Sequence, residues 1–273
     1  FTDTQPKRQR VVDFNQGLDA RHLDAKKLKI LSRLNISPMR VAFDNVKDKK
    51  TYTQAVKRAF KNGFRIFSNY MLYNCKDTPT DLYERLQINM KLNDEWSDKS
   101  VRRGQVYSYP MRFAPIKDPG NHENRSREYR QPNLHNRRNW LKNAIWTPRF
   151  VRNIEIIKGA AHGAISPTPS LARRAVGETY EEFLANLYMP EVLLRNRNKH
   201  EKRVHRFEPK RKPGTGKVEA FRKFILALLK KGGRRFRMFH EAVCMNRADD
   251  VRKALESCKD EELKKWLKEY LKK

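Results

Sequence analysis

The chain has 273 residues, with 61 Lys and Arg against 31 Asp and Glu, so its formal net charge is +30 at pH 7. This length can bury a core without disulfide or metal crosslinks, and the 14 Phe, 10 Tyr and 4 Trp exclude an intrinsically disordered chain. No stretch approaches ~18 consecutive apolar residues, and the N-terminal residues show no apolar signal core, so we expect neither a membrane span nor an export signal.

The first part of the chain alternates strand and helix patterns. Strand patterns lie near residues 11–17, 39–44, 64–73 and 105–116. Apolar residues at helical spacing follow the first three of them, from Leu23, Tyr52 and Leu82 onward. Thr78 and Pro79 suit the N-cap and first position of the third helix. The alternation predicts βα units with a parallel sheet.

The second part of the chain predicts loops and helices. We expect residues 117–139 to form a long basic surface loop, within a region of loop and helices over residues 117–194. Residues 195–217 are rich in Lys and Arg and end in Pro-Gly-Thr-Gly, which predicts a basic linker. Residues 218–273 predict a small basic module of three amphipathic helices.

Polar residues follow each predicted strand at its carboxyl end. In a parallel βα array these ends open on one shared crevice. Amides and carboxylates suit ribose hydroxyls, purine edges and amino-acid head groups, whereas the alternative interpretation is that they only form turns and helix caps. The candidate binding residues are Asn15, Gln16, Asp44, Asn74, Lys76, Asp77 and Arg112.

Four stretches resemble one known family. The runs DFNQGLDAR, RVAFD, FSNYMLYNCKDTPTDLYERL and VYSYPMRFAPI look like the later strands of the radical S-adenosylmethionine (radical SAM) barrel, in an iron-sulfur-binding, oxidoreductase-like branch. WTPRFVRNIEIIKGAAHGAISP resembles the segment after that barrel, so the resemblance covers roughly residues 10–190. It implies an α/β fold: an incomplete radical SAM-type partial TIM barrel in residues 1–116, made of the later four strands, followed by an α-helical C-terminal extension.

The resemblance also implies two cofactors, S-adenosylmethionine and a [4Fe-4S] cluster held by a CxxxCxxC motif. This chain has no such motif, and 169 and 14 positions separate Cys75, Cys244 and Cys258, so we expect no metal ligands in it. By position, Asn15 and Gln16 match residues that approach the cofactor, and Asp44 matches a polar residue near the ribose. Residues 74–77 match the loop beside the adenosyl group, and residues 110–112 match the strand near the adenine.

The expected function is therefore the C-terminal portion of a radical SAM enzyme that acts on an unknown substrate. Its catalytic residues are unknown, and we expect the chain to be inactive by itself and to need an N-terminal half or split-protein partner that carries CxxxCxxC. Cys75 is either a radical quencher or auxiliary ligand in the crevice, or inert packing. The cysteines, odd in number and widely spaced, predict a reducing cytoplasm.

Two other functions fit the sequence. A nucleic-acid-binding, RNA-directed role is suggested by arginines interleaved with Tyr129 in residues 117–139, and by Arg234, Arg235 and Arg237 beside Phe236 and Phe239. The other alternative is a catalytically inactive half-barrel that is retained for assembly.

Overall fold

The protein is described here from a computed structural model that covers residues 10–75, 77–97, 103–113, 144–207 and 216–272. Three strands, β1 (Met39–Arg40), β2 (Ile66–Tyr73) and β3 (Gln105–Arg112), form a parallel sheet in the order β1-β2-β3. The α/β class is confirmed. Over the described residues the sheet is small and open, and the strand predicted at 39–44 is reduced to two residues.

The strand predicted at 11–17 is wrong. Two isolated parallel bridges, Val12 with Ile36 and Leu18 with Val41, place this segment beside the chain that leads into and out of β1. Between the bridges the backbone turns, because the Gly17 N–H donates to the Phe14 carbonyl at 2.8 Å and Gly17 has a φ of 81°. Glycine adopts this left-handed conformation without steric cost, so the extended pattern is interrupted.

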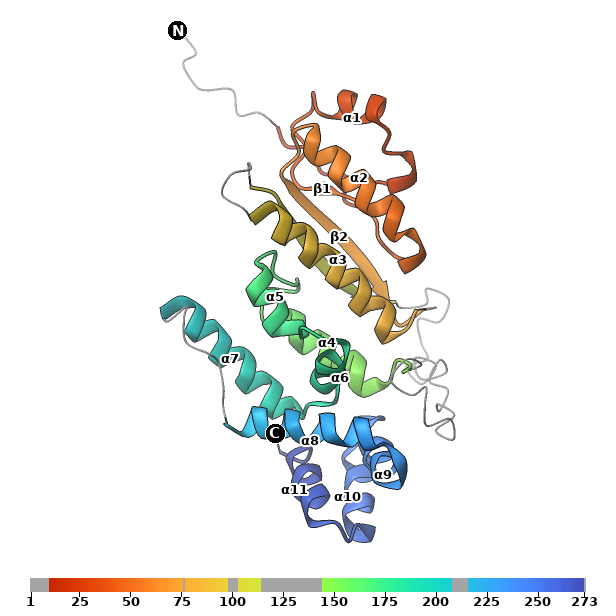
Figure 1. Cartoon of the computed structure of the whole chain (residues 1–273), viewed down its shortest axis with the longest axis vertical. Helices are drawn as coiled ribbons and strands as arrows, with labels where there is room; N and C mark the ends of the chain where they lie inside the picture. Colours follow the sequence, from red (N-terminus) through yellow and green to blue (C-terminus); the bar gives the residue numbers. More distant parts are fainter. Residues whose placement is uncertain (1–9, 76, 98–102, 114–143, 208–215, 273) are drawn as a thin grey trace.

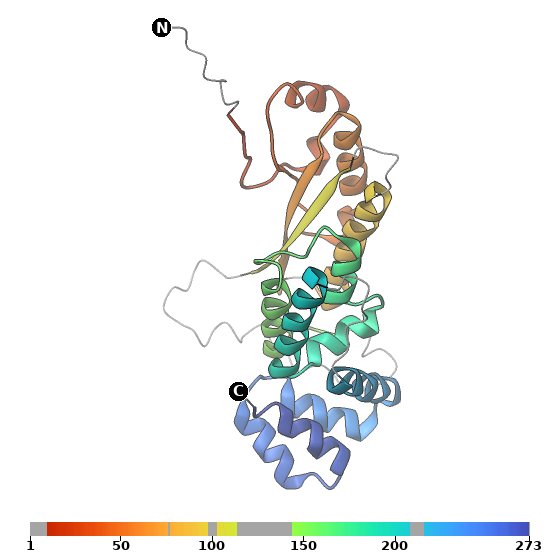
Figure 2. The ribbon, with the colours of Figure 1, turned by 90° about the vertical axis from the view of Figure 1, so that its left-hand side faces the viewer.

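Helices cover one face of the sheet. After α1 (Ala25–Leu31), α2 (Lys49–Lys61) precedes β2 and α3 (Pro79–Ser97) precedes β3, and both pack on the same side (Figures 1 and 2). The predicted start of α3 is confirmed: the Thr78 N–H donates to the Asp81 carboxylate at 2.8 Å, and the Asp81 N–H donates to the Thr78 hydroxyl at 3.2 Å. This reciprocal pair satisfies N–H groups at the helix N-terminus.

A buried polar cluster joins these helices to the sheet. Tyr52 of α2 donates its hydroxyl to Asn89 of α3 at 2.9 Å and accepts from Asn69 of β2 at 2.8 Å. Asn89 in turn donates to the Ser108 hydroxyl of β3 at 2.7 Å. Because buried polar groups need partners, this chain of bonds fixes the register of the two helices against the sheet.

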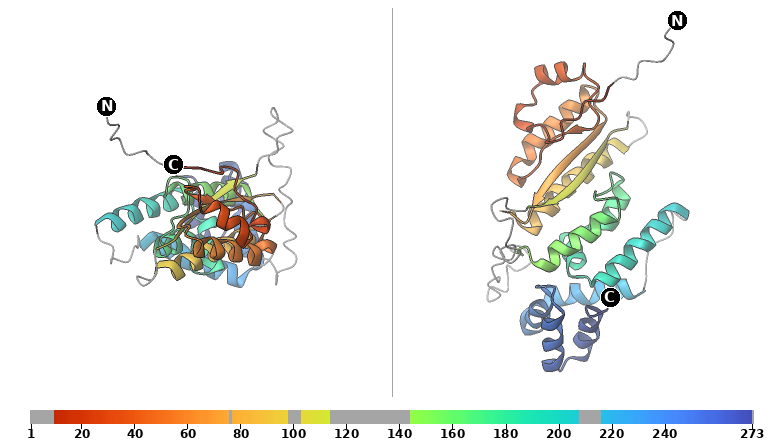
Figure 3. Two further views of the ribbon diagram at one scale, coloured as in Figure 1. Left: turned by 90° about the horizontal axis from the view of Figure 1, so that it is seen from above. Right: turned by 180° about the vertical axis from the view of Figure 1, so that it is seen from behind.

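The rest of the described chain is helical. Its helices are α4 (Pro148–Gly159), α5 (Pro169–Val176), α6 (Tyr180–Tyr188), α7 (Glu191–Phe207), α8 (Gly216–Lys231), α9 (Gly233–Val243), α10 (Ala248–Ser257) and α11 (Glu261–Glu269). They lie below the sheet in Figure 1, with α8 to α11 at the far end of the molecule, as Figure 3 also shows. Buried apolar residues from the sheet to α11 belong to one cluster.

Two predictions for this half need correction. Residues 195–207, which we expected in an irregular basic linker, belong to helix α7. The predicted three-helix module at residues 218–273 contains a further helix, α9, whose buried Phe236, Phe239 and Val243 lie three and four positions apart. In the part of the chain that the structure describes, no helix is both long and apolar enough to cross a membrane.

Candidate functional site

The face of the sheet opposite α2 and α3 is uncovered by any helix of the described chain (Figure 2). We call it the open face. Alternation along the strands and the register of β1, β2 and β3 place on it Arg40, Ile66, Ser68, Tyr70, Leu72, Tyr107, Tyr109 and Met111. Three of its apolar side chains are well exposed: Ile66 at 45%, Leu72 at 37% and Met111 at 44%. Parallel sheets normally have both faces covered, so this face is a candidate binding surface.

A row of polar contacts crosses the open face. The Arg40 guanidinium donates to both carboxylate oxygens of Asp13, at 2.7 and 2.9 Å, and to the Ser68 hydroxyl at 3.1 Å. Its Cζ lies 5.4 Å from the centroid of the Tyr70 ring, and that ring lies 5.8 Å from the Tyr109 ring. The hydrogen bond from Arg40 lowers the pKa of Asp13. The row therefore presents a fixed cation beside two aromatic rings.

Asn15 lies at this row. The Tyr70 hydroxyl donates to the Asn15 side-chain oxygen at 3.3 Å, which places the turn at residues 15–17 beside the middle of β2. Gln16 occupies the same turn and is exposed. These two predicted residues therefore adjoin the open face, through tertiary contact between segments 55 residues apart.

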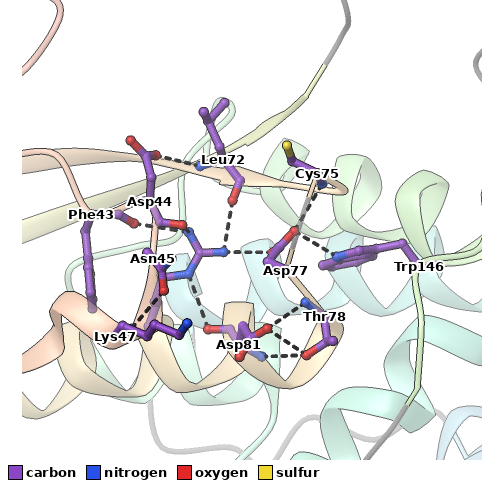
Figure 4. A network of polar contacts seen from close by, with 11 residues as sticks. Phe43, Asp44, Asn45, Lys47, Leu72, Cys75, Asp77, Thr78, Asp81 and Trp146 are labelled. Carbon is purple, nitrogen blue, oxygen red and sulfur yellow. Dashed lines mark hydrogen bonds and ion pairs between the residues drawn. The ribbon is translucent and has the colours of Figure 1, made fainter. Parts of the chain in front are cut away.

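Asp44 lies in the segment that follows β1 and contacts the carboxyl end of β2. Its carboxylate accepts the Leu72 N–H at 3.1 Å, and the side chain is otherwise exposed (Figure 4). Asp44 therefore lies at the carboxyl edge of the sheet, as expected. One of its carboxylate oxygens accepts a backbone N–H of β2, and the other faces solvent.

Arg85 of α3 holds this edge together, although no sequence pattern singles it out. The side chain is 0% exposed. Its Nη1 donates to the carbonyls of Phe43 and Asp44, both at 3.1 Å, and its Nη2 donates to the Leu72 carbonyl at 2.9 Å and to the Asp77 carboxylate at 2.8 Å (Figure 4). One guanidinium thus joins the segment after β1, the carboxyl end of β2 and the segment that begins α3. We call this set of contacts the Arg85 network.

Asp77 is fully engaged by protein donors. Besides Arg85, the Trp146 Nε1–H and the Cys75 N–H each donate to its carboxylate at 3.2 Å (Figure 4). Burial raises the pKa of Asp77, while the charge of Arg85 opposes that shift. Asp77 therefore serves the Arg85 network, and no cofactor contact is needed to explain it.

The remaining residues of the loop at 74–77 are placed differently. Asn74 is half-buried and has a φ of 64°, a left-handed conformation that Asn tolerates in turns. Cys75 is exposed, so the interpretation of it as inert packing is wrong. Lys76 lies outside the described residues.

Arg112 is separated from the other candidates. It is opposite Tyr73 in the register of β2 and β3, and Tyr73 is buried on the covered face, where its hydroxyl donates to Glu155 of α4 at 2.6 Å. Arg112 is exposed and belongs to this side of the sheet, away from Asn15 and Tyr70.

The cysteines do not fit a [4Fe-4S] cluster. Cys244 and Cys258 are buried, whereas Cys75 is exposed. Over the described residues no three His, Cys, Asp or Glu side chains are grouped as metal ligands.

Three of the predicted nucleic-acid contacts in the C-terminal helices are used within the protein, although Arg234 is exposed. Arg235 forms ion pairs with Asp260 and Glu262, both at 2.6 Å. Phe236 and Phe239 are buried in the core and cannot stack on bases. The basic loop at 117–139 lies outside the described residues.

Comparisons with protein-family models, with curated proteins and with solved structures all found no match. A function is therefore inferred from the open face, the carboxyl edge of the sheet and the charge of the chain.

Proposed function

We propose that this chain supplies one wall of a radical SAM-type βα half-barrel and that its open face binds the adenosyl group of S-adenosylmethionine. One observation carries the proposal: the strands are parallel and in chain order, with α2 and α3 on one face and the other face open. In a βα barrel the strands have this order and the helices lie outside. Side chains fill the inner face, and the loops that follow the strands form the ligand site. The resemblance in sequence points to the same architecture.

The chemistry of the open face suits a nucleoside. The rings of Tyr70 and Tyr109 offer stacking surfaces, and stacking on an aromatic side chain is worth about 1–3 kcal/mol per base. Asn15 offers an amide for a base edge or a ribose hydroxyl, and Asp44 has a solvent-facing oxygen at the carboxyl edge. The Arg85 network would keep that edge rigid, and Asp77 acts there as a positioning residue.

In this proposal the cluster comes from a partner segment that carries CxxxCxxC. Bound there, it would supply the electron that cleaves S-adenosylmethionine. The residues described here would bind and orient the adenosyl group and exclude water from it. The identity of the substrate stays open, and the chain alone is expected to bind the nucleoside without catalysis.

Calorimetric titration of the isolated chain with S-adenosylmethionine and with S-adenosylhomocysteine tests this function. We expect Tyr109→Ala to weaken binding about tenfold, since it removes a stacking surface. Asp44→Ala should weaken it as well, and Asp44→Asn separates the lost charge from the lost cap on Leu72, because the amide oxygen still accepts. Glu256→Ala, which removes an exposed carboxylate of α10, is the matched control. No binding by the folded chain, or unchanged affinity of Tyr109→Ala, would refute the proposal.

A second candidate function is binding of single-stranded RNA. The net charge of +30 favours a polyanionic partner, and the tyrosines of the open face suit unpaired bases. Binding that falls steeply with salt concentration is expected, because Lys and Arg that contact phosphates release counterions. Absence of binding at low salt would exclude it.

A further inference from the structure

A pocket of about 430 Å³ lies between α4, α7, α10 and the end of α11, far from the open face. Its volume is within the range of small-molecule and cofactor sites. Five cationic side chains and one carboxylate line it: Arg149, Arg195, Arg247, Arg252, Lys272 and Glu191. We call it the basic pocket. None of these residues was singled out by the sequence patterns.

Arg149 is a buried cation in the wall of this pocket. Arg149 is 4% exposed, and its Nε–H donates a long hydrogen bond of 3.4 Å to the Val243 carbonyl. The Tyr270 ring lies 4.8 Å from its Cζ. Burial lowers the pKa of Arg149. No carboxylate of the described chain forms an ion pair with it, so a bound anion would compensate a charge that has lost most of its water.

The carboxylates nearby are already engaged. Glu191 accepts both bonds of a fork from Arg152, at 2.9 and 3.1 Å, and one from Arg195 at 3.5 Å. Arg252 pairs with Asp249 at 2.6 Å on the same helix. Lys272 likewise pairs with Glu269 at 2.6 Å. The positive potential of the pocket therefore comes mainly from Arg149 and Arg247.

Arg247 adds to this potential, whereas the first turn of α10 also carries two carboxylates, Asp249 and Asp250. Arg247 is the exposed N-cap of α10 and forms no side-chain cap bond. Ala248, the first residue of the helix, also lines the pocket. The N–H groups at a helix N-terminus attract anions, and the residues that begin α10 line the same pocket as Arg149.

We propose that the basic pocket binds a phosphodiester group of a single-stranded nucleic acid. Arginine forks match the oxygens of a phosphate, and the charge of the whole chain favours a partner with many phosphates. This inference rests on the second candidate function and names its phosphate subsite. Free phosphate has the same chemistry, so the experiment must separate the two sources.

The test measures fluorescence anisotropy of a labelled single-stranded oligouridylate with the full chain over a series of salt concentrations. Arg247→Ala is expected to weaken binding about tenfold, the effect of losing one charge-assisted bond. It should also reduce the slope of log affinity against log salt by about 0.7. Arg33→Ala, which removes an exposed charge next to α1 at the opposite end of the molecule, is the matched control and should leave the affinity nearly unchanged.

Two further measurements complete the design. Arg149→Met removes the buried charge and keeps most of the side-chain volume. The thermal melting midpoint of this variant shows whether a loss of oligonucleotide binding reflects unfolding. Titration with inorganic phosphate alone should displace the oligonucleotide only weakly, because it offers a single phosphate.

Three outcomes would overturn the inference. Equal weakening by Arg247→Ala and Arg33→Ala would show that net charge alone acts, and RNA binding would stand without this subsite. Tight phosphate binding that is lost in Arg247→Ala, with no competition from oligouridylate, would assign the pocket to free phosphate. Absence of oligonucleotide binding at low salt would remove the second candidate function together with its subsite, and would leave the S-adenosylmethionine proposal to its own titration.

Discussion

Replacement of Arg85 by Met tests whether one buried guanidinium holds the carboxyl edge of the sheet. Arg85→Met keeps most of the side-chain volume and removes the charge and its donors. We expect the free energy of unfolding to fall by about 3–5 kcal/mol, the usual cost of removing one partner of a buried ion pair. In the unaltered protein the Arg85 Nη2 lies 2.8 Å from the Asp77 carboxylate. The substitution leaves this largely buried carboxylate without its cationic partner.

The magnitude follows from the contacts that are lost. Arg85 donates to the Phe43, Asp44 and Leu72 carbonyls at 3.1, 3.1 and 2.9 Å, as well as to Asp77. Each hydrogen bond to a charged group contributes about 1.5–3 kcal/mol net. The simple sum overestimates the loss, because methionine avoids the desolvation cost of burying a guanidinium and water can reach some of the carbonyls.

Urea denaturation monitored by circular dichroism measures this change from the shift in midpoint. Lys49→Ala is the control, since Lys49 pairs with Glu84 at 2.6 Å but is 55% exposed. It should cost less than about 1 kcal/mol. The double variant Arg85→Met with Asp77→Leu should recover part of the loss, because no buried carboxylate is left unpaired. A loss below about 1 kcal/mol for Arg85→Met would refute the reasoning, because it would show that the pair and the carbonyl contacts contribute little.

Two further perturbations probe other buried contacts. Burial lowers the pKa of His240 from 6.5 to about 4, so the unfolded chain binds the proton more strongly than the folded chain does. The contribution of neutral His240 to the free energy of unfolding is therefore fully present above pH 6.5 and is lost as the pH falls towards 4. The loss should reach about 3 kcal/mol; His240→Gln should flatten the profile of urea midpoint against pH, and an unchanged slope would contradict this origin. Gly177→Ala should destabilise by about 1–3 kcal/mol, because φ is 119° and the new Cβ would lie 2.8 Å from the Phe183 nitrogen. Gly159→Ala meets no atom within 4 Å and should leave the melting midpoint nearly unchanged, so equal effects of the two substitutions would argue against a steric cause.

Local patterns were sufficient where many residues agree. The strand predicted at 64–73 corresponds to β2 (Ile66–Tyr73), and the start of α3 at Pro79 followed from its N-cap and proline. The strand predicted at 11–17 failed because the chain turns after Phe14, where the Gly17 N–H donates to the Phe14 carbonyl and Gly17 has a positive φ. An extended pattern cannot show whether such a glycine uses that freedom.

The polar residues at strand ends could be selected from the sequence, but their partners could not. Asn15 and Asp44 do lie beside β2, Asn15 at its middle and Asp44 near its carboxyl end. Arg112 does not join them, since the register with Tyr73 places it on the covered side. A displacement by one residue reverses the face of a strand, so only the paired sheet decides this.

The sequence by itself determined the α/β class, the strong positive charge, the start of α3 and the absence of a CxxxCxxC motif. Only the tertiary structure decided that Arg85 is buried, because its acceptors lie up to 42 positions away in the chain. The same holds for the basic pocket, where α4, α7 and α10 bring together arginines from positions 149 to 252. Charge and periodicity are local properties of a sequence, whereas desolvation and the choice of ion-pair partner depend on which distant segments pack together.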